Sequence, residues 1–308
     1  MRILVTGGAG FIASHIADAF VAAGHQVSVI DDLSSGKREN LNPSVRFHQL
    51  DVQNPAVADV FRRERPEVLC HHAAQMDVRR SVADPLFDAR VNLLGLLNLM
   101  ECGRQHGLQR VVFASTGGAI YGEQEAFPAA ETHKTEPLSP YGVAKLASER
   151  YLFFYAVTYG ISYTALRYAN VYGPRQNPHG EAGVVAIFTE KLLRGEQPII
   201  NGDGTQTRDY VYVGDVVRAN LAALESDFVG VLNLGTGIET DVNAVFRILT
   251  KLCASAVPER HGPAKPGEQR RSVIDNTLAK RVLGWEPQVR LEDGLRETVA
   301  FFRQRLGM

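Results

Sequence analysis

The first 32 residues contain the pattern that most restricts the fold of this chain. A short apolar run at 2–6 breaks into a glycine-rich segment at 7–13, which leads into a helical pattern. A second apolar run at 26–30 ends in the acid pair Asp31 and Asp32. This order predicts a β-strand, a tight turn, a helix and a second strand that ends in an acid, which is the unit that binds a dinucleotide in doubly wound α/β proteins.

The residues of this unit have separate physical roles in the prediction. Gly7 permits the tight turn, and Gly10 allows backbone N–H groups to approach a pyrophosphate at the helix N-terminus. Ala13 takes the position of close helix–strand contact, where glycine is more usual but alanine is accepted. Asp31 follows at the sequence distance expected of a residue that binds the ribose diol. This favours NAD over NADP, because a 2′-phosphate would meet a carboxylate.

The alternation of strands and helices continues through the first half of the chain. Further apolar runs lie at 45–50, 68–72 and 111–114, with helical patterns between them at about 57–65 and 85–106. The residues that follow these runs are small or polar: Asp51 and Val52, Ala73 and Ala74, and Ser115 and Thr116. This alternation predicts an α/β fold with a doubly wound parallel sheet of the Rossmann type, and ligands at the carboxyl ends of its strands.

A tyrosine and a lysine four residues apart mark the candidate catalytic site. If the segment is helical, Tyr141 and Lys145 share one face, with the ammonium beside the phenol. Acting as a base near neutrality requires the phenol pKa to fall from about 10 by roughly 3, which corresponds to about 4 kcal/mol. A cation about 4 Å away supplies a Coulomb energy of about that size. We therefore expect Lys145 to be nearly sufficient to lower the pKa of the Tyr141 phenol by this amount. A cationic nicotinamide ring nearby would help.

The composition narrows the classes of partner and compartment. A balance of 33 basic and 34 acidic residues argues against a nucleic acid or an anionic membrane as partner. No apolar run approaches 18 residues and a strand follows Met1 directly, so we expect no membrane span, no signal peptide and a cytoplasmic location. Three scattered cysteines indicate reduced thiols. Adjacent strand residues Cys70, His71 and His72 point to opposite faces, so we expect no metal site.

Several motifs follow one another in a characteristic order along nearly the full chain. They are the glycine-rich 6–12, Asp31-Asp32-Leu33, Asp51-Val52, Ser115-Thr116, Tyr141-x-x-x-Lys145 and Arg167-Tyr168-x-Asn170-Val171-Tyr172-Gly173-Pro174. In this order they resemble the extended short-chain dehydrogenase/reductase family, and most of all its nucleotide-sugar epimerase branch.

The resemblance implies a role for each matching position. For the cofactor NAD it implies contacts from Gly7, Gly10, Phe11, Ile12, Asp31, Asp32, Asp51, Val52, Ala73, Ala74, Gln75, Asn92, Tyr141, Lys145 and Tyr168. For catalysis it implies Thr116 as the hydrogen-bond partner of the reacting sugar hydroxyl, Tyr141 as the base and Lys145 as the holder of the nicotinamide ribose. For the substrate diphosphate it implies Asn170 and Arg208.

The implied reaction interconverts UDP-glucose and UDP-galactose. Tyr141 takes the proton of the sugar 4-hydroxyl while hydride leaves carbon 4 for tightly bound NAD, and hydride then returns to the other face of a 4-keto sugar. Related dehydratases carry an Asp-Glu pair directly after the threonine, and related decarboxylases carry a glutamate in that region. This chain has Gly117 and Gly118, so hydride return is the second step that remains.

Two alternatives remain open. The first is another NAD-dependent nucleotide-sugar enzyme, such as a UDP-glucuronate 4-epimerase, or a nucleotide-sugar reductase that releases its cofactor; Asp31 argues against an NADPH-dependent reductase. The second is a sensor or scaffold that binds a dinucleotide without turnover. The presence of Thr116, Tyr141 and Lys145 argues against this alternative, because binding without turnover does not need these three side chains.

The predicted substrate site departs from the family pattern in the last third of the chain. Lys265 stands where the family usually has arginine, and Glu268 stands where it usually has aspartate. Lysine is a point charge without the arginine fork, so we expect Arg271 to take over a phosphate contact. Ser272 stands where relatives carry a bulky residue beside carbon 2 of the sugar. A serine leaves room for an N-acetyl group, which predicts activity on UDP-N-acetylglucosamine as well.

Two domains and a homodimer complete the expectations. Residues 1–168 plus 209–235 are expected to form the NAD-binding domain, with a return to the main sheet from Tyr210. Residues 169–208 plus 236–308 are expected to form a smaller α/β domain for the nucleotide sugar. Helices near 93–100 and 151–155 are apolar on more than one face, which in this family implies a dimer closed by a four-helix bundle.

Overall fold

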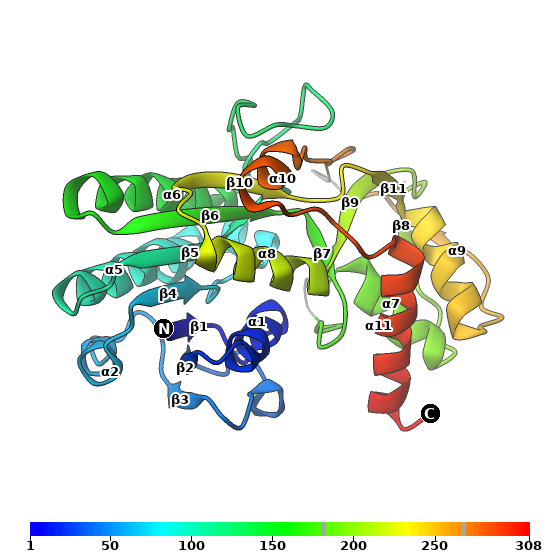
Figure 1. The fold of residues 1–308 in the computed structure, drawn as a ribbon. Helices are drawn as coiled ribbons and strands as arrows, with labels where there is room; N and C mark the ends of the chain where they lie inside the picture. Colours follow the sequence, from blue (N-terminus) through cyan, green and yellow to red (C-terminus); the bar gives the residue numbers. More distant parts are fainter. Residues whose placement is uncertain (180–182, 266–268) are drawn as a thin grey trace.

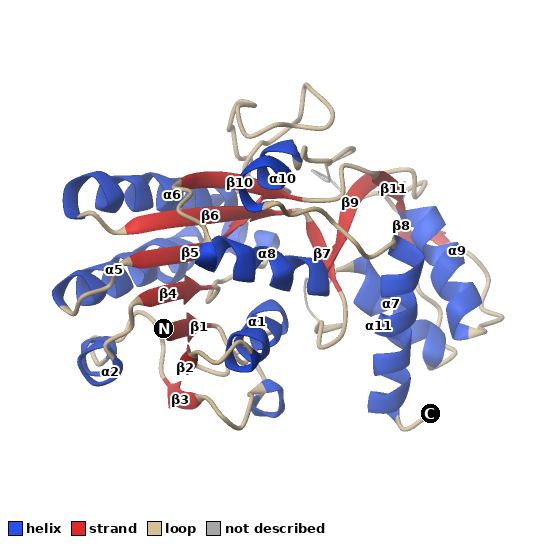
Figure 2. Ribbon diagram, viewed as in Figure 1, coloured by secondary structure: helices blue, strands red, loops and turns tan. Residues whose placement is uncertain are grey.

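Seven parallel strands form the central sheet of the computed structural model, which describes residues 1–179, 183–265 and 269–308 (Figures 1 and 2). They are β1 (Arg2–Thr6), β2 (Gln26–Asp31), β3 (Arg46–Gln49), β4 (Val68–His71), β5 (Arg110–Thr116), β6 (Ser162–Tyr168) and β10 (Gly230–Leu234). Their order is β10-β6-β5-β4-β1-β2-β3, and all neighbours are parallel. The order reverses between β1 and β4, where such sheets bind ligands beyond the carboxyl ends of the strands. The predicted doubly wound α/β fold is confirmed.

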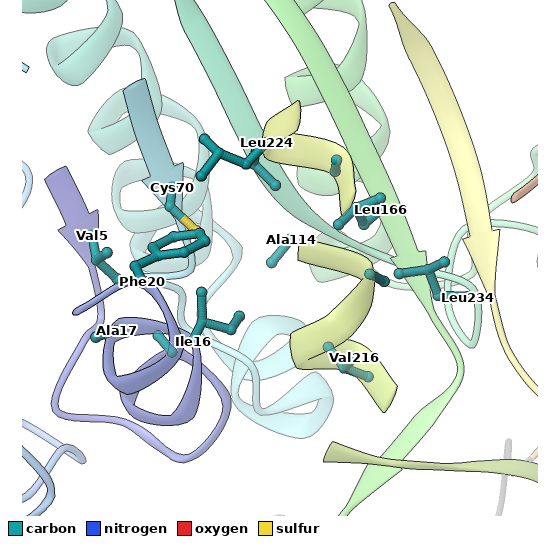
Figure 3. Close-up of a cluster of buried hydrophobic side chains, with 14 of the residues drawn as sticks. Val5, Ile16, Ala17, Phe20, Cys70, Ala114, Leu166, Val216, Leu224 and Leu234 are labelled. Carbon is teal, nitrogen blue, oxygen red and sulfur yellow. The ribbon is translucent and has the colours of Figure 1, made fainter. Parts of the chain in front are cut away.

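Helices cover both faces of this sheet, because its strands are apolar on both sides. One face carries α1 (Phe11–Ala22), α8 (Val213–Glu225) and α10 (Thr277–Leu283), and the other carries α2 (Val57–Glu64), α5 (Gly95–Gln105) and α6 (Pro140–Tyr159). Figure 3 shows the first of these cores, in which Phe20 of α1 and Leu224 of α8 lie together with the strand residue Cys70. Burying one such apolar side chain contributes about 1.5–3 kcal/mol relative to its exposure.

The prediction of one continuous α-helix at 85–106 is wrong. This segment consists of α4 (Pro85–Ala89), a π-helical turn η2 (Arg90–Leu94) and α5, and a short α3 (Val78–Ala83) precedes it. The wider turn places Asn92, which is 2% exposed, against the backbone of Gln75. Asn92 Oδ1 accepts from Gln75 N, and its Nδ2 donates to Gln75 O, both at 2.9 Å. π-helical turns of this kind are frequent at functional sites.

A smaller lobe lies at one end of the main sheet, on the right in Figure 1. Its three-stranded sheet has the order β11 (Glu239–Asp241), β9 (Thr207–Tyr212) and β7 (Asn170–Tyr172), and β8 (Ile200–Asn201) pairs with β12 (His261–Gly262). The helices α7 (Val184–Leu193), α9 (Val242–Cys253) and α11 (Leu291–Leu306) enclose its separate apolar core. The short 3-10 helix η1 (Arg38–Asn40) follows β2 in the main lobe. No helix within the described ranges is long and apolar enough to cross a membrane.

The expected return to the main sheet at Tyr210 comes too early in the chain. Tyr210 lies in β9, which pairs with β7 and β11, and its side chain belongs to the core of the smaller lobe. The return begins with α8, and β10 then forms the edge of the main sheet. The division of the chain into two domains at the stated boundaries stays a prediction.

Candidate active site

The glycine turn joins β1 to α1 and lies against the segment that follows β4. Gly7 has a φ of +71°, and a Cβ there would stand 2.8 Å from Ala73 N, so the position requires glycine. Gly10 is the N-cap of α1, and its N donates to Gly7 O at 2.9 Å. Because Gly10 has no side chain to cap the helix, the first N–H groups of α1 remain available to an anionic ligand. Ala13 is 2% exposed in the core beneath, as predicted for a close helix–strand contact.

Thr6 fastens the segment after β4 to this turn. Its Oγ1 accepts from His72 N and from Ala73 N, each at 3.2 Å, and lies 2.7 Å from His71 Nδ1. Ala73 and Ala74 therefore lie beside the glycine turn, where contacts to a cofactor pyrophosphate are predicted. His72 Nε2 is bound to the Tyr168 hydroxyl at 2.9 Å, so both histidines have partners within the protein.

Asp31 is buried at the end of β2 and braces the glycine turn. Its Oδ2 accepts from Ala9 N at 2.9 Å, and its Oδ1 accepts from Leu33 N at 2.8 Å. Burial raises the pKa of Asp31, and the hydrogen bonds from Leu33 and Ala9 oppose that rise. Each oxygen keeps a second lone pair, so the predicted ribose contact is compatible with this bracing. Asp32 is on the surface and accepts from the backbone and hydroxyl of Ser34.

The remaining residues predicted to contact the cofactor lie along the same edge of the sheet. Asp51 Oδ1 accepts from Gln53 N at 2.8 Å, and Val52 is buried with its carbonyl bound by Asn98. Phe11 and Ile12 are half-buried in the first turn of α1. Their roles toward a nucleotide stay predictions.

Helix α6 places the tyrosine and lysine as predicted. Ser139 is its N-cap and accepts from Gly142 N at 3.2 Å, and Pro140 occupies the first helical position. Tyr141 and Lys145 therefore fall on one face of the first turns. Lys145 is 3% exposed, and its Nζ donates to Ala114 O at 2.8 Å and lies 5.9 Å from the centre of the Tyr141 ring. The lysine thus ties α6 to β5, the strand that ends in Thr116.

The pKa of Tyr141 beside Lys145 is shifted in the direction opposite to the prediction. Burial raises the pKa of Tyr141, and the Asp88 carboxylate raises it further. Burial lowers the pKa of Lys145 to about 8, although Asp88 and then Glu149 oppose the fall. The prediction that Lys145 is nearly sufficient to lower the phenol pKa is therefore wrong, because desolvation of the phenolate outweighs the attraction of a single buried cation.

Thr116 and Asn170 come together although they belong to different sheets. A Cβ built on Gly118 would lie 4.0 Å from Thr116 Oγ1 and 3.9 Å from Asn170 Oδ1. The space beside Gly118 therefore borders both side-chain oxygens. Thr116 pairs in register with Tyr168 on β6. Tyr168 is 6% exposed, and its hydroxyl binds His72 and Asn220 in the interior, so any contact with a cofactor would come from another part of the residue.

The residues predicted for the substrate lie in or beside the smaller lobe. Arg208 is on β9, and its Nη1 donates to the carbonyl of Thr207 at 2.7 Å. Lys265 is exposed, and Glu268 falls outside the described residues. Ser272 is 4% exposed, and its carbonyl accepts from Asp209 N at 2.9 Å.

Arg271, expected to contact the diphosphate, has other partners in this structure. Its Nε and Nη2 donate to the two carboxylate oxygens of Glu239 at 3.0 and 2.5 Å. Its guanidinium stands over the Phe127 ring, 3.7 Å from the centre. A phosphate contact would require Arg271 to leave Glu239, which accepts from Thr207 Oγ1 as well.

The polar segment that begins at Arg175 lies against α1. Arg175 Nη1 contacts Asp18 Oδ2 of α1 at 2.8 Å, and His15 Nε2 lies 2.9 Å from Pro174 O. Residues 180–182 fall outside the described residues. The described part of the loop is thus tied to the helix whose N-terminus forms the glycine turn.

Sequence reasoning missed a buried polar network beneath the site. Arg167 Nε and Nη2 donate to the two oxygens of Glu149 at 2.9 and 2.7 Å, and Ser115 Oγ donates to Glu149 Oε1 at 2.6 Å. Tyr121 Oη accepts from Arg167 Nη1 at 2.9 Å and donates to Asn233 at 2.6 Å. One signal was available, because Glu149 lies four residues after Lys145 on the same helix face. For buried Asp88, no pattern in the sequence gave a signal.

Comparisons with known proteins give this geometry a family. The UDP-glucose 4-epimerase of Mycolicibacterium smegmatis is 46% identical over 312 residues, which cover 99% of each chain. The solved structure of Thermotoga maritima UDP-glucose 4-epimerase with UDP-glucose has a TM-score of 0.98 at 51% identity, over 99% of this chain and 100% of that one. The solved structure of the Thermus thermophilus UDP-glucose 4-epimerase complex with NAD has a TM-score of 0.94 at 47% identity, over 98% of this chain and 99% of that one. Residues 3–235 match the model of the NAD dependent epimerase/dehydratase family, and the chain belongs to that family.

Proposed function

We propose that this protein is an isomerase that interconverts UDP-glucose and UDP-galactose by reversible hydride transfer at carbon 4, with tightly bound NAD. One observation carries the proposal. Tyr141 and Lys145 share a helix face that Lys145 ties to the strand ending in Thr116, while the next two positions are glycines. The Mycolicibacterium smegmatis relative and the Thermotoga maritima structure, which match over nearly the full chain, bear the name of this activity.

The residues around the glycine turn fit a dinucleotide. Gly7 and Gly10 leave a cradle that a side chain would fill, and the N-terminus of α1 offers free N–H groups to a pyrophosphate. Asp31 stands at the end of β2 for the ribose. When bound there, NAD supplies the acceptor and later the donor of the hydride at carbon 4 of the sugar.

Proton transfer falls to the chain's own residues. Tyr141, as phenolate, takes the proton of the 4-hydroxyl while the carbon–hydrogen bond at carbon 4 breaks. Thr116 holds that hydroxyl by a hydrogen bond, and Lys145 stabilises negative charge on the phenolate oxygen. The product of this half-reaction is a 4-keto sugar. Tyr141 then returns the proton as hydride adds to the opposite face, so no net oxidation occurs.

The positions after Thr116 favour this reaction over elimination of water. A side chain at Gly117 would place its Cβ 2.7 Å from Ile274 Cδ1 and 3.2 Å from Tyr168 O, so an acid or base does not fit there. Gly118 has open space but carries no side chain. Because positions 117 and 118 supply no acid–base side chain, the return of hydride is the next step that we propose for the 4-keto sugar.

The proposal is tested by incubating the purified protein with UDP-galactose, without added cofactor, and recording NMR spectra for UDP-glucose. Conversion without added NAD supports both the activity and retained cofactor. No conversion, even after NAD is added, contradicts the proposal and directs the search to UDP-glucuronate. A requirement for continual supply of reduced cofactor would favour a reductase instead.

The substrate range extends the proposal. We expect UDP-N-acetylglucosamine and UDP-N-acetylgalactosamine to be interconverted as well, because Ser272 is small where a bulkier side chain would narrow the pocket beside carbon 2. Arg208, Asn170, Lys265 and Glu268 are proposed to bind the rest of the nucleotide sugar.

A homodimer and a role in galactose metabolism in the cytoplasm belong to the same proposal. Apolar side chains along α6 and η2 are exposed in the single chain, among them Leu94 at 54%, Tyr151 at 40%, Phe154 at 44% and Val157 at 71%. Burying them against a second copy removes apolar surface from water, and a solution mass at the monomer value would contradict the dimer. Free, buried Cys70, Cys102 and Cys253 are compatible with a reducing compartment.

A further inference from the structure

Asp88 is a fully buried carboxylate that the proposed reaction leaves without a role. Its relative exposure is 0%, and its Oδ1 accepts from Gln75 Nε2 at 3.1 Å and from Asn92 Nδ2 at 2.9 Å. Its Oδ2 has no hydrogen-bond partner among the residues that the structure describes. Both donors are neutral amides, so they orient the carboxylate without compensating its charge. Burying an uncompensated carboxylate is costly unless a cation lies nearby.

The helix beside Asp88, α6, carries the buried cation Lys145. Helix α4 packs against α6, and Asp88 lines a cavity of about 530 Å³ together with Ser139, Pro140 and Ala144, the residues on either side of Tyr141 and just before Lys145. Asp88, and then Glu149, raise the pKa of Lys145 against the effect of burial.

The other charged and titratable groups around Lys145 do not take the place of Asp88. Glu149, on the same helix, is bound through both oxygens by Arg167 of β6, so its charge is already compensated. Burial, and then the Lys145 charge, lower the pKa of His71 at the end of β4 and of His72 just after it, which favours their neutral forms. Tyr141 lies on the same face of α6 as Lys145, and burial followed by Asp88 favours its neutral form.

We propose that Asp88 is a positioning residue for the epimerisation proposed above: its carboxylate is the counter-charge that keeps the buried Lys145 ammonium protonated, and it fixes the amides of Gln75 and Asn92. Burial lowers the pKa of Lys145 to about 8, and Asp88 limits that fall. Replacing Asp88 by a neutral residue therefore makes Lys145 lose its proton at lower pH. The phenol of Tyr141 also ionises at lower pH, since the same carboxylate disfavours the phenolate.

The first experiment follows the charge of Lys145 directly and needs no substrate. The protein as purified is labelled with ¹³C at the lysine Cε positions, the Lys145 signal is assigned from its loss in Lys145→Arg, and the signal is titrated with pH. In the nearly isosteric Asp88→Asn we expect the midpoint to fall by about 1 pH unit, the lower end of what a nearby opposite charge produces. The control is Asp84→Asn, the exposed N-cap of the same helix, which should leave the midpoint unchanged. An unmoved midpoint in Asp88→Asn overturns the proposal, and Asp88→Ser gives the same test if the asparagine variant does not fold.

The second experiment measures kcat against pH with UDP-galactose. If Asp88 acts through charge, the whole profile of Asp88→Asn moves to lower pH, because both Lys145 and Tyr141 titrate earlier. If Asp88 only fills space, the height of the profile changes but its position does not, which overturns the proposal. Absence of epimerase activity in the unmodified protein would refute the proposed function alone, because the lysine titration remains a valid test of the charge pairing.

Discussion

The buried ion pair of Arg167 and Glu149 joins β6 to α6. We expect its loss to destabilise the protein strongly. Replacing Arg167 with methionine removes two charged donors from Glu149, which then keeps only the hydroxyl of Ser115. Glu149 is 3% exposed, so water cannot replace the lost bonds. Removing one partner of a buried ion pair costs about 3–5 kcal/mol. We expect the free energy of unfolding of Arg167→Met to fall by about this amount in urea titrations followed by fluorescence of the single tryptophan, Trp285.

Two further variants test the reasoning. Arg167→Met combined with Glu149→Leu removes both charges, so it should recover most of the loss, less about 1 kcal/mol for each hydrogen bond lost by Ser115 and Tyr121. Arg296→Met breaks the exposed Arg296–Glu292 pair on α11 and should change stability by less than about 0.5 kcal/mol. The reasoning is refuted if Arg167→Met matches the Arg296 control, or if the double variant is as unstable as the single one.

Three other substitutions address the binding sites. Gly7→Ala forces a Cβ to 2.8 Å from Ala73 N at a φ of +71°, so we expect the purified variant to lack the absorbance of retained nucleotide; full retention would contradict the close packing. Arg271→Ala should raise the KM for UDP-galactose strongly if this guanidinium exchanges Glu239 for the diphosphate, and an unchanged KM would remove Arg271 from the substrate site. Ser272→Tyr should abolish turnover of the N-acetylated sugars only, and equal loss on UDP-galactose would count against the pocket assignment.

The parts of this structure that could be predicted are those that depend on neighbours in sequence. The strand, turn and helix around Gly7 follow from a local change of periodicity and from a position that only glycine can occupy. The shared face of Tyr141 and Lys145 follows from helical spacing once Ser139 and Pro140 mark where the helix starts. Both features would survive in any fold that keeps those segments intact.

The parts that could not be predicted depend on contacts between distant segments. Asp88 looks like an ordinary surface acid of a short helix, and only the packing of α4 on α6 buries it beside Lys145. The π-helical turn that aims Asn92 at Gln75 changes the helical phase by one residue, which apolar periodicity does not resolve. The Glu239 partner of Arg271 is likewise supplied by a distant segment, and the phosphate contact suggested by the motif position of Arg271 stays a prediction.

The protonation of Tyr141 connects these observations with the reaction. Burial and Asp88 both favour the neutral phenol, and Lys145 alone does not reverse that preference. When bound, oxidised NAD would supply the further positive charge needed for Tyr141 to act as the base of the proposed reaction. Without that charge, burial and Asp88 would favour the neutral phenol, so Tyr141 could hold the proton it has taken and return it later. In the proposed reaction one side chain would thus act as base and then as acid, which is consistent with glycines at 117 and 118 in place of a second acid–base group.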